Sequence, residues 1–236
     1  MRLYLTELSA GAICRSHLSG GTDDAGRRSI GDNTIMVEKS QWTVMIEQNP
    51  DHSHWYAQRF RDMAAAGKDL HGEARLVDAM APRQARVLDA GCGPGRLGGE
   101  LIERGHSVVG VDVDPVLIDA AKTDYPGGTW LLQDLAELDL AGAGVEAGFD
   151  VIVGAGNVMP FLAPSTRQTV LANLRGVLAA DGRLVLGFGA GRGYSYEDFF
   201  ADVADVQLST DVALSTWELH PWTPDSEFLV AVLSHA

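Results

Sequence analysis

Cysteine and long apolar runs are both scarce in this chain of 236 residues. The two cysteines, Cys14 and Cys92, are too few and too far apart for a disulfide framework or a zinc site. No apolar run approaches the roughly 20 residues that a membrane-spanning helix needs, and Thr6 and Glu7 interrupt the apolar start that a signal peptide would require. We therefore expect a cytoplasmic protein with no membrane partner.

Positive charge is also in short supply. The chain has 18 Lys and Arg against 32 Asp and Glu, a formal net charge of −14, with no run of basic residues. Such a field repels phosphate backbones, so we expect no nucleic-acid partner. No histidine pair or carboxylate pair has the spacing of metal ligands, and we expect no metal site. At 46% hydrophobic residues the composition is that of an ordinary globular domain.

The first 40 residues differ from the remainder. They are rich in Gly, Ser, Asp and Arg and lack a lasting period of 2 or 3.6, so we expect residues 1–40 to be a disordered extension before a single domain at 41–236. A regulatory tail and a true start of the chain at Met36 are the alternatives.

Beyond residue 50 the chain predicts alternating helices and strands. Asp51 or Ser53 is a candidate cap for a helix ending near Gly67, and a short helix follows before Pro82. Expected strands lie at 86–90, 107–111, 129–132, 149–153 and 183–188, and expected helices lie at 96–104, 115–122 and 165–178. This alternation favours a parallel sheet with helices on both faces. The runs 206–217 and 227–233, joined without a helix, predict an antiparallel pair at the sheet's edge.

The strongest motif is a glycine turn between the first of these strands and its helix, with Asp89, Gly91, Cys92, Gly93 and Gly95 in sequence. Alternate glycines let the backbone bend sharply and approach a ligand without a Cβ in the way. The free N–H groups at the helix start favour an anionic group there. The motif predicts a ligand site, with a tight structural turn as the alternative.

Two further acidic positions follow the next strands. Asp112 stands 21 positions after Gly91, where a carboxylate accepts from both hydroxyls of a ribose, while Asp114 before Pro115 fits a helix cap. Asp134 could accept from an adenine amino group, with the Leu135 N–H donating to the ring and Val113 packing on its face. A plain polar strand end is the alternative for Asp134.

Together these motifs resemble those of the class I S-adenosylmethionine-dependent methyltransferases, over about residues 51–236. The resemblance implies a Rossmann-like, seven-stranded, mostly parallel sheet that ends in an antiparallel hairpin, S-adenosylmethionine as cofactor, and a small-molecule acceptor. It also implies that the backbone near Ala155 and Gly156 holds the amino group of the methyl donor, and that the helices before the glycine turn cover the donor. The acceptor itself stays open.

Two other functions compete with this one. A dinucleotide-binding dehydrogenase wants a third glycine three positions after Gly93, where this chain has Arg96. A regulatory protein that binds S-adenosylmethionine without catalysis would share every cofactor motif.

The catalytic group is less defined. The candidates near the acceptor are Tyr56, His71, Asn157 and His220. Arg59 or Arg75 could pair with the carboxylate of the donor. Trp217 and Trp222, near His220, are expected either to line the acceptor site or to pack ordinarily in the hairpin.

Overall fold

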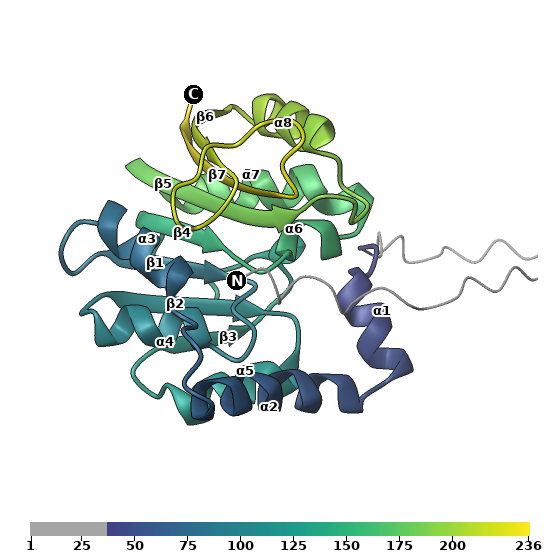
Figure 1. The fold of residues 1–236 in the computed structure, drawn as a ribbon, viewed down its shortest axis with the longest axis vertical. Coiled ribbons are helices and arrows are strands. Elements are labelled where there is room, and N and C mark those ends of the chain that lie inside the picture. Colours follow the sequence, from purple (N-terminus) through teal and green to yellow (C-terminus); the bar gives the residue numbers. More distant parts are fainter. Residues whose placement is uncertain (1–36) are drawn as a thin grey trace, which may run out of the picture. The chain divides into compact units, whose positions relative to one another are not determined.

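The computed structural model describes residues 37–236, and its centre is a seven-stranded sheet in the order β3-β2-β1-β4-β5-β7-β6 (Figure 1). β1 to β5 run parallel, while β7 lies antiparallel between β5 and β6. This confirms the predicted fold class and the terminal antiparallel pair. The strands are β1 (Arg86–Ala90), β2 (Ser107–Asp112), β3 (Thr129–Leu132), β4 (Phe149–Gly154), β5 (Leu178–Gly189), β6 (Leu208–Leu214) and β7 (Phe228–His235).

Helices cover both faces of the sheet because its strands are apolar on both sides. Residues of α3, α4 and α5 share one core with alternate strand residues such as Val87 and Val108, and residues of α6, α7 and α8 share the other with Leu88 and Val109. The helices are α1 (Gln41–Gln48), α2 (Asp51–Ala65), α3 (Gly72–Met80), α4 (Arg96–Glu103), α5 (Pro115–Asp124), η1 (Leu135–Glu137), α6 (Val158–Phe161), η2 (Pro164–Thr166), α7 (Arg167–Val177) and α8 (Tyr196–Asp205). Within the described part of the chain, none of them is both long and apolar enough to cross a membrane.

The expected extension overlaps the folded unit at its end. Residues 1–36 lie outside the described residues, whereas Val37–Ala236 forms one compact unit. Ser40 caps α1, its hydroxyl accepting from the amide of Thr43 at 3.0 Å, and the hydroxyl of Ser165 donates to Glu38 at 2.5 Å. Residues 37–40 are therefore attached to the domain.

Several local predictions were wrong in detail. α2 starts after Pro50, so neither Asp51 nor Ser53 caps it, and the hydroxyl of Ser53 donates instead to Asp114. α1 and α8 were not predicted at all. The predicted helix 165–178 is the short η2 followed by α7, and β5 begins at Leu178 rather than 183 because the chain pairs with β4 through a register shift.

Candidate functional site

The glycine turn lies at the carboxyl edge of the sheet, between β1 and α4, where open parallel sheets bind ligands. Gly91, Gly93 and Gly95 all have positive φ, at 75°, 53° and 80°. A Cβ on Gly91 would lie 2.5 Å from Val158, so no larger residue fits there. At Gly93 a Cβ would meet only Tyr56, at 3.8 Å. The turn is therefore packed on one side and open toward Tyr56 on the other.

Asp112 joins the end of β2 to this turn. Its Oδ2 accepts from the amide of Gly93 at 2.8 Å, and its Oδ1 accepts from the amide of Asp114 at 2.9 Å. Burial raises the pKa of Asp112 to about 6, against the opposing effect of these backbone donors. Each carboxylate oxygen can accept a second hydrogen bond, so the side chain retains capacity for two hydroxyl donors.

Asp89 and Cys92 support the turn from inside the domain. The carboxylate of Asp89 is buried and accepts from the amide of Gly98 at 3.0 Å, and its burial raises its pKa to about 7. The thiol of Cys92 is also buried, its Sγ close to where a Cβ of Gly110 would lie, and the amide of Cys92 donates to Val111. The Asp89 carboxylate therefore fixes the first turn of α4, and the backbone of Cys92 fixes the glycine turn against β2.

The predicted adenine residues lie at the end of the neighbouring strand. The amide of Gln133 donates to the carbonyl of Asp112 at 3.0 Å, which brings the segment after β3 next to β2. Asp134 caps η1, its Oδ1 accepting from the amide of Ala136 at 2.8 Å, and Leu135 is buried. Val113 is half-buried in the turn after Asp112. The four predicted ribose and adenine residues thus share one edge.

The loop after β4 is tied to β5. Oδ1 of Asn157 accepts from the amide of Gly189 at 2.8 Å, and Asn157 has a positive φ of 70°. Ala155 is half-buried, and a Cβ on Gly156 would meet nothing within 4 Å. The carboxamide of Asn157 therefore ties the loop after β4 to the end of β5. Gly156 leaves open space beside this loop.

Aromatic side chains from three helices meet beside the open side of the turn. The ring of Trp42 in α1 lies 5.2 Å from that of Tyr56 and 6.0 Å from that of Phe161 in α6, and Phe60 lies 5.1 Å from Tyr56. We call Trp42, Tyr56, Phe60 and Phe161 the aromatic cover. Burial raises the pKa of the Tyr56 phenol, so it stays protonated at neutral pH. Trp42 was missed because it lies between the segment expected to be disordered, 1–40, and the first predicted helix, which begins at Asp51.

The remaining histidine candidates lie elsewhere. Nδ1 of His71 is 3.0 Å from Oε2 of Glu100 on α4, and His220 is exposed on the β6–β7 connection. The two tryptophans near His220 pack against other residues of the domain. Trp217 is buried against Gly187, and the ring of Trp222 lies 5.7 Å from that of Tyr196.

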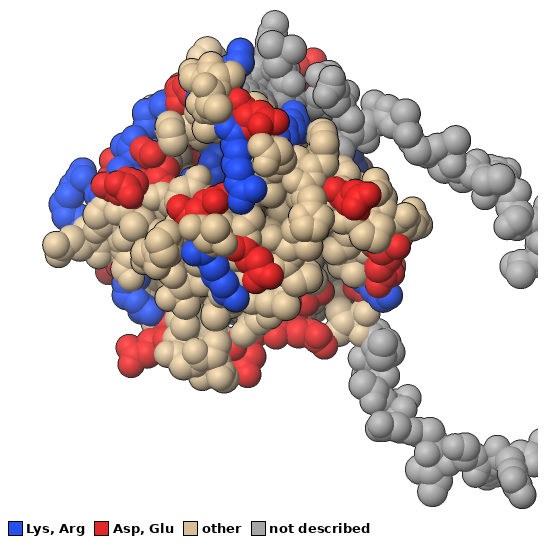
Figure 2. All heavy atoms as spheres, turned by 90° about the horizontal axis from the view of Figure 1, so that it is seen from below, with Lys and Arg blue, Asp and Glu red and all other residues tan. Residues whose placement is uncertain are grey.

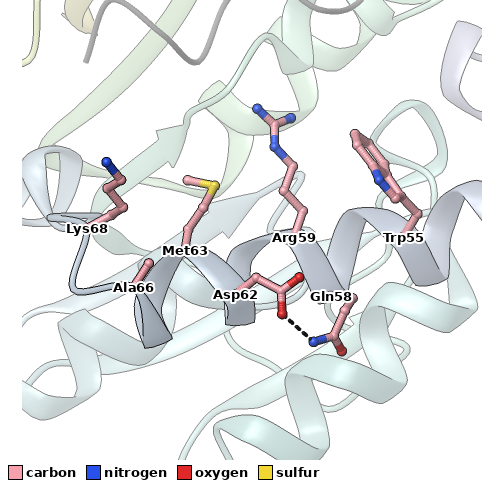
Figure 3. Close-up of a pocket in the computed structure, with 7 residues that line it drawn as sticks. All are labelled: Trp55, Gln58, Arg59, Asp62, Met63, Ala66 and Lys68. Carbon is pink, nitrogen blue, oxygen red and sulfur yellow. Dashed lines mark hydrogen bonds between the residues drawn. The ribbon is translucent and has the colours of Figure 1, made fainter.

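The two arginine candidates also differ. Arg75 is exposed and pairs with Asp69 on the surface, 2.8 Å between Nη2 and Oδ2. Arg59 lies one turn beyond Tyr56, its guanidinium 5.5 Å from the Trp55 ring. It lines a cavity of about 340 Å³ along α2, into which Figure 3 shows Trp55, Arg59, Met63 and Lys68 extending on one side of the helix.

Arg96, where a dinucleotide site would have its third glycine, is instead a structural anchor. Its Nη2 lies 2.9 Å from Oε1 of Glu73, its Nη1 donates to the carbonyl of Leu70, and its guanidinium lies 5.4 Å from the Phe60 ring. Side-chain exposure is 17% for Arg96 and 15% for Glu73. This ion pair holds α3 against the start of α4, directly after the glycine turn.

Known proteins are similar to this chain in sequence and in fold. Residues 87–182 match the model of a methyltransferase domain family. A crystal structure described as a TehB-like S-adenosylmethionine-dependent methyltransferase from Corynebacterium glutamicum is 53% identical, with a TM-score of 0.76, and the match covers 80% of this chain and all of that one. An uncharacterised methyltransferase of Mycobacterium tuberculosis is 34% identical over 121 residues, which are 50% of this chain and 57% of that relative's length.

The CcbJ methyltransferase of Streptomyces caelestis is 18% identical with a TM-score of 0.62, over 70% of this chain and 89% of that one, and shows the shared fold. The fold, the glycine turn and the acid after β2 define a Rossmann-like nucleoside-binding protein. With the extensive match to the Corynebacterium protein, the chain belongs to the class I S-adenosylmethionine-dependent methyltransferases. Among residues 37–236, no three His, Cys, Asp or Glu side chains are grouped to hold a metal ion.

Proposed function

We propose that the protein transfers a methyl group from S-adenosylmethionine to a small-molecule acceptor at the carboxyl edge of the sheet. The observation that carries the proposal is the pairing of the open glycine turn with Asp112, whose carboxylate bonds Gly93 and keeps capacity for two more donors. S-adenosylmethionine supplies an activated methyl group on a sulfonium, so this chemistry requires no metal.

The residues present fit this cofactor. Asp112 would accept from the ribose hydroxyls, Val113 would pack on the adenine, and Asp134 with the Leu135 amide would bond its edge. Oδ1 of Asp134 caps η1, and its Oδ2 accepts no hydrogen bond from another residue in 37–236. Oδ2 is therefore available to accept from the adenine amino group. Gly93 and the carbonyls of Ala155 and Gly156 would border the amino-acid end.

Arg59 is the cation that we propose for the donor's carboxylate. It follows by one helical turn Tyr56, which faces Gly93 of the glycine turn. Arg75 is engaged with Asp69 at the surface and is a poorer choice. In this role Arg59 would bring α2 over the donor site.

The acceptor site would lie where the aromatic cover meets the loops after β4 and β5. Trp42 contacts Phe161, and a Cβ on Gly193 after β5 would lie 4.0 Å from the side chain of Gln41 in α1. A site bounded by α1, α2 and α6 suits a small apolar or aromatic molecule. The net charge of −14 opposes a nucleic-acid substrate, and Figure 2 shows acidic and basic side chains interspersed over one face of the domain.

The chain's own contribution to the reaction would be positioning. In-line transfer needs the acceptor nucleophile, the methyl carbon and the sulfur held in a row with water excluded. The aromatic cover would exclude water, and the bond from the Gly189 amide to Asn157 would keep the loop beside the methyl group in place. Tyr56, protonated at neutral pH, would donate a hydrogen bond rather than accept a proton.

The partition of a labelled methyl group tests the proposal. The protein is incubated with methyl-tritiated S-adenosylmethionine and a bacterial extract that has been separated by size into low-mass, protein and RNA fractions. We expect enzyme-dependent label in the low-mass fraction alone. Label in protein or RNA would refute the small-molecule acceptor, and donor binding without turnover in any fraction would favour the regulatory alternative.

A further inference from the structure

A single buried carboxylate joins the helices before the glycine turn to the segment after β2. Asp114 is fully buried and accepts four hydrogen bonds. Its Oδ1 accepts from the amides of Val116 and Leu117 at 2.9 and 3.3 Å, which is the helix cap predicted from the sequence. Its Oδ2 accepts from the indole of Trp42 at 2.8 Å and the hydroxyl of Ser53 at 2.5 Å, which no local pattern predicted.

α1 depends on contacts with the remainder of the domain. It has eight residues, none of them buried, and a helix this short is marginal without tertiary contacts. Trp42 provides those contacts, since its ring packs on Tyr56 and Phe161 while its N–H reaches Asp114. Figure 1 shows α1 standing at the end of the domain toward which the parallel strands point, near α6.

Asp114 is placed to connect this cover with the donor site. Its amide donates to Asp112, which in turn accepts from the amide of Gly93. Tyr56 of α2 faces the same Gly93 from the other side. The hydrogen bonds from Trp42 and Ser53 therefore reach Asp114, which stands two positions after Asp112, the proposed ribose ligand. These contacts surround the open side of the glycine turn.

We propose that Asp114 is a positioning residue that, through Trp42 and Ser53, holds α1 and α2 closed over the donor. The inference rests on the proposed function for the identity of the donor. With the cover held in place, donor release requires the bond between Trp42 and Asp114 to break. Removing the bond should speed release while leaving the ribose and adenine contacts intact.

Trp42→Phe tests this, because phenylalanine retains an aromatic ring and lacks the N–H donor. A hydrogen bond to a charged acceptor corresponds to about tenfold or more in an equilibrium. We expect amide hydrogen exchange in residues 41–48 to quicken about tenfold and S-adenosylhomocysteine to dissociate about tenfold faster in stopped-flow measurements. Exchange in β1 and β2 should stay unchanged. Ser53→Ala should act in the same direction through α2.

Trp222→Phe is the matched control, because the indole nitrogen of Trp222 is buried with no partner among the described residues. Equal acceleration of release in this control would show a general loss of stability and overturn the proposal, as would unchanged exchange in α1 of Trp42→Phe. Loosened α1 with unchanged release would refute the link to the donor. Failure of the unaltered protein to bind S-adenosylhomocysteine would refute the proposed function instead, and the exchange measurement would still decide whether Asp114 holds α1.

Discussion

Replacing Asp112 by alanine should weaken the binding of S-adenosylhomocysteine by roughly 10- to 100-fold. The two ribose hydroxyls would lose their acceptor. Hydrogen bonds to a charged acceptor contribute about 1.5–3 kcal/mol, and about 1.4 kcal/mol corresponds to a tenfold change in affinity. The substitution also removes the acceptor of the Gly93 and Asp114 amides. We therefore expect the free energy of unfolding to fall by about 1–3 kcal/mol as well.

Titration calorimetry and urea unfolding separate the two effects. Asp150→Ala is the matched control, because Asp150 also accepts from a backbone amide, that of Arg86 at 2.8 Å, but at the opposite edge of the sheet. It should lose stability and bind S-adenosylhomocysteine normally. If Asp112→Ala loses stability like the control and keeps its affinity, Asp112 is a structural residue and the ribose assignment is wrong.

Three further predictions follow from the geometry. Burial raises the folded-state pKa of Asp112 to about 6, above its unfolded value, so the contribution of Asp112 to stability grows as pH falls from 7 to 4. Affinity for S-adenosylhomocysteine should drop below pH 6, where the carboxylate becomes protonated. Calorimetry should find a smaller drop in Asp112→Asn. Glu73→Ala leaves a buried guanidinium unpaired and should cost about 3 kcal/mol in urea unfolding, against under about 1 kcal/mol for Asp69→Ala at an exposed pair; equal costs would contradict this. Gly91→Ala should lower the melting temperature more than Gly67→Ala, because both have positive φ but only at Gly91 would a Cβ clash, at 2.5 Å; the reverse order would refute that packing.

The sequence predicted the first half of the sheet well because its signals there are local. β1 and β3 have the predicted bounds, and β2 extends one residue further, to Asp112. Each is a short apolar run with glycine or polar residues at its ends. Asp114 before Pro115 marked the start of α5, and the structure confirms that cap.

The features that were missed depend on contacts between distant segments. Trp42 and Asp114 are 72 positions apart, and Asn157 and Gly189 are 32 apart. α1 has only eight residues, too few for the helical spacing of Trp42, Met45 and Ile46 to stand out in the sequence. Asp181 and Gly182 resemble a turn, yet they lie within β5, which accommodates them through its register shift with β4.

The same distinction applies to the site. The glycine turn and Asp112 could be predicted as candidate site residues because backbone geometry at the carboxyl edge of the sheet sets their residue types and spacing. The role of Arg96 could not be predicted from local spacing, because its partner Glu73 lies in a different helix. The fold brings the two side chains together and shields them from solvent.

A crystal structure with bound S-adenosylhomocysteine tests the central claim most directly. The account predicts both ribose hydroxyls within hydrogen-bonding distance of the Asp112 carboxylate, the adenine between Val113 and Leu135, and the amino-acid end between Gly93 and Tyr56. Density for the ligand away from the carboxyl edge of β1 and β2, or a ribose that does not contact Asp112, would contradict it.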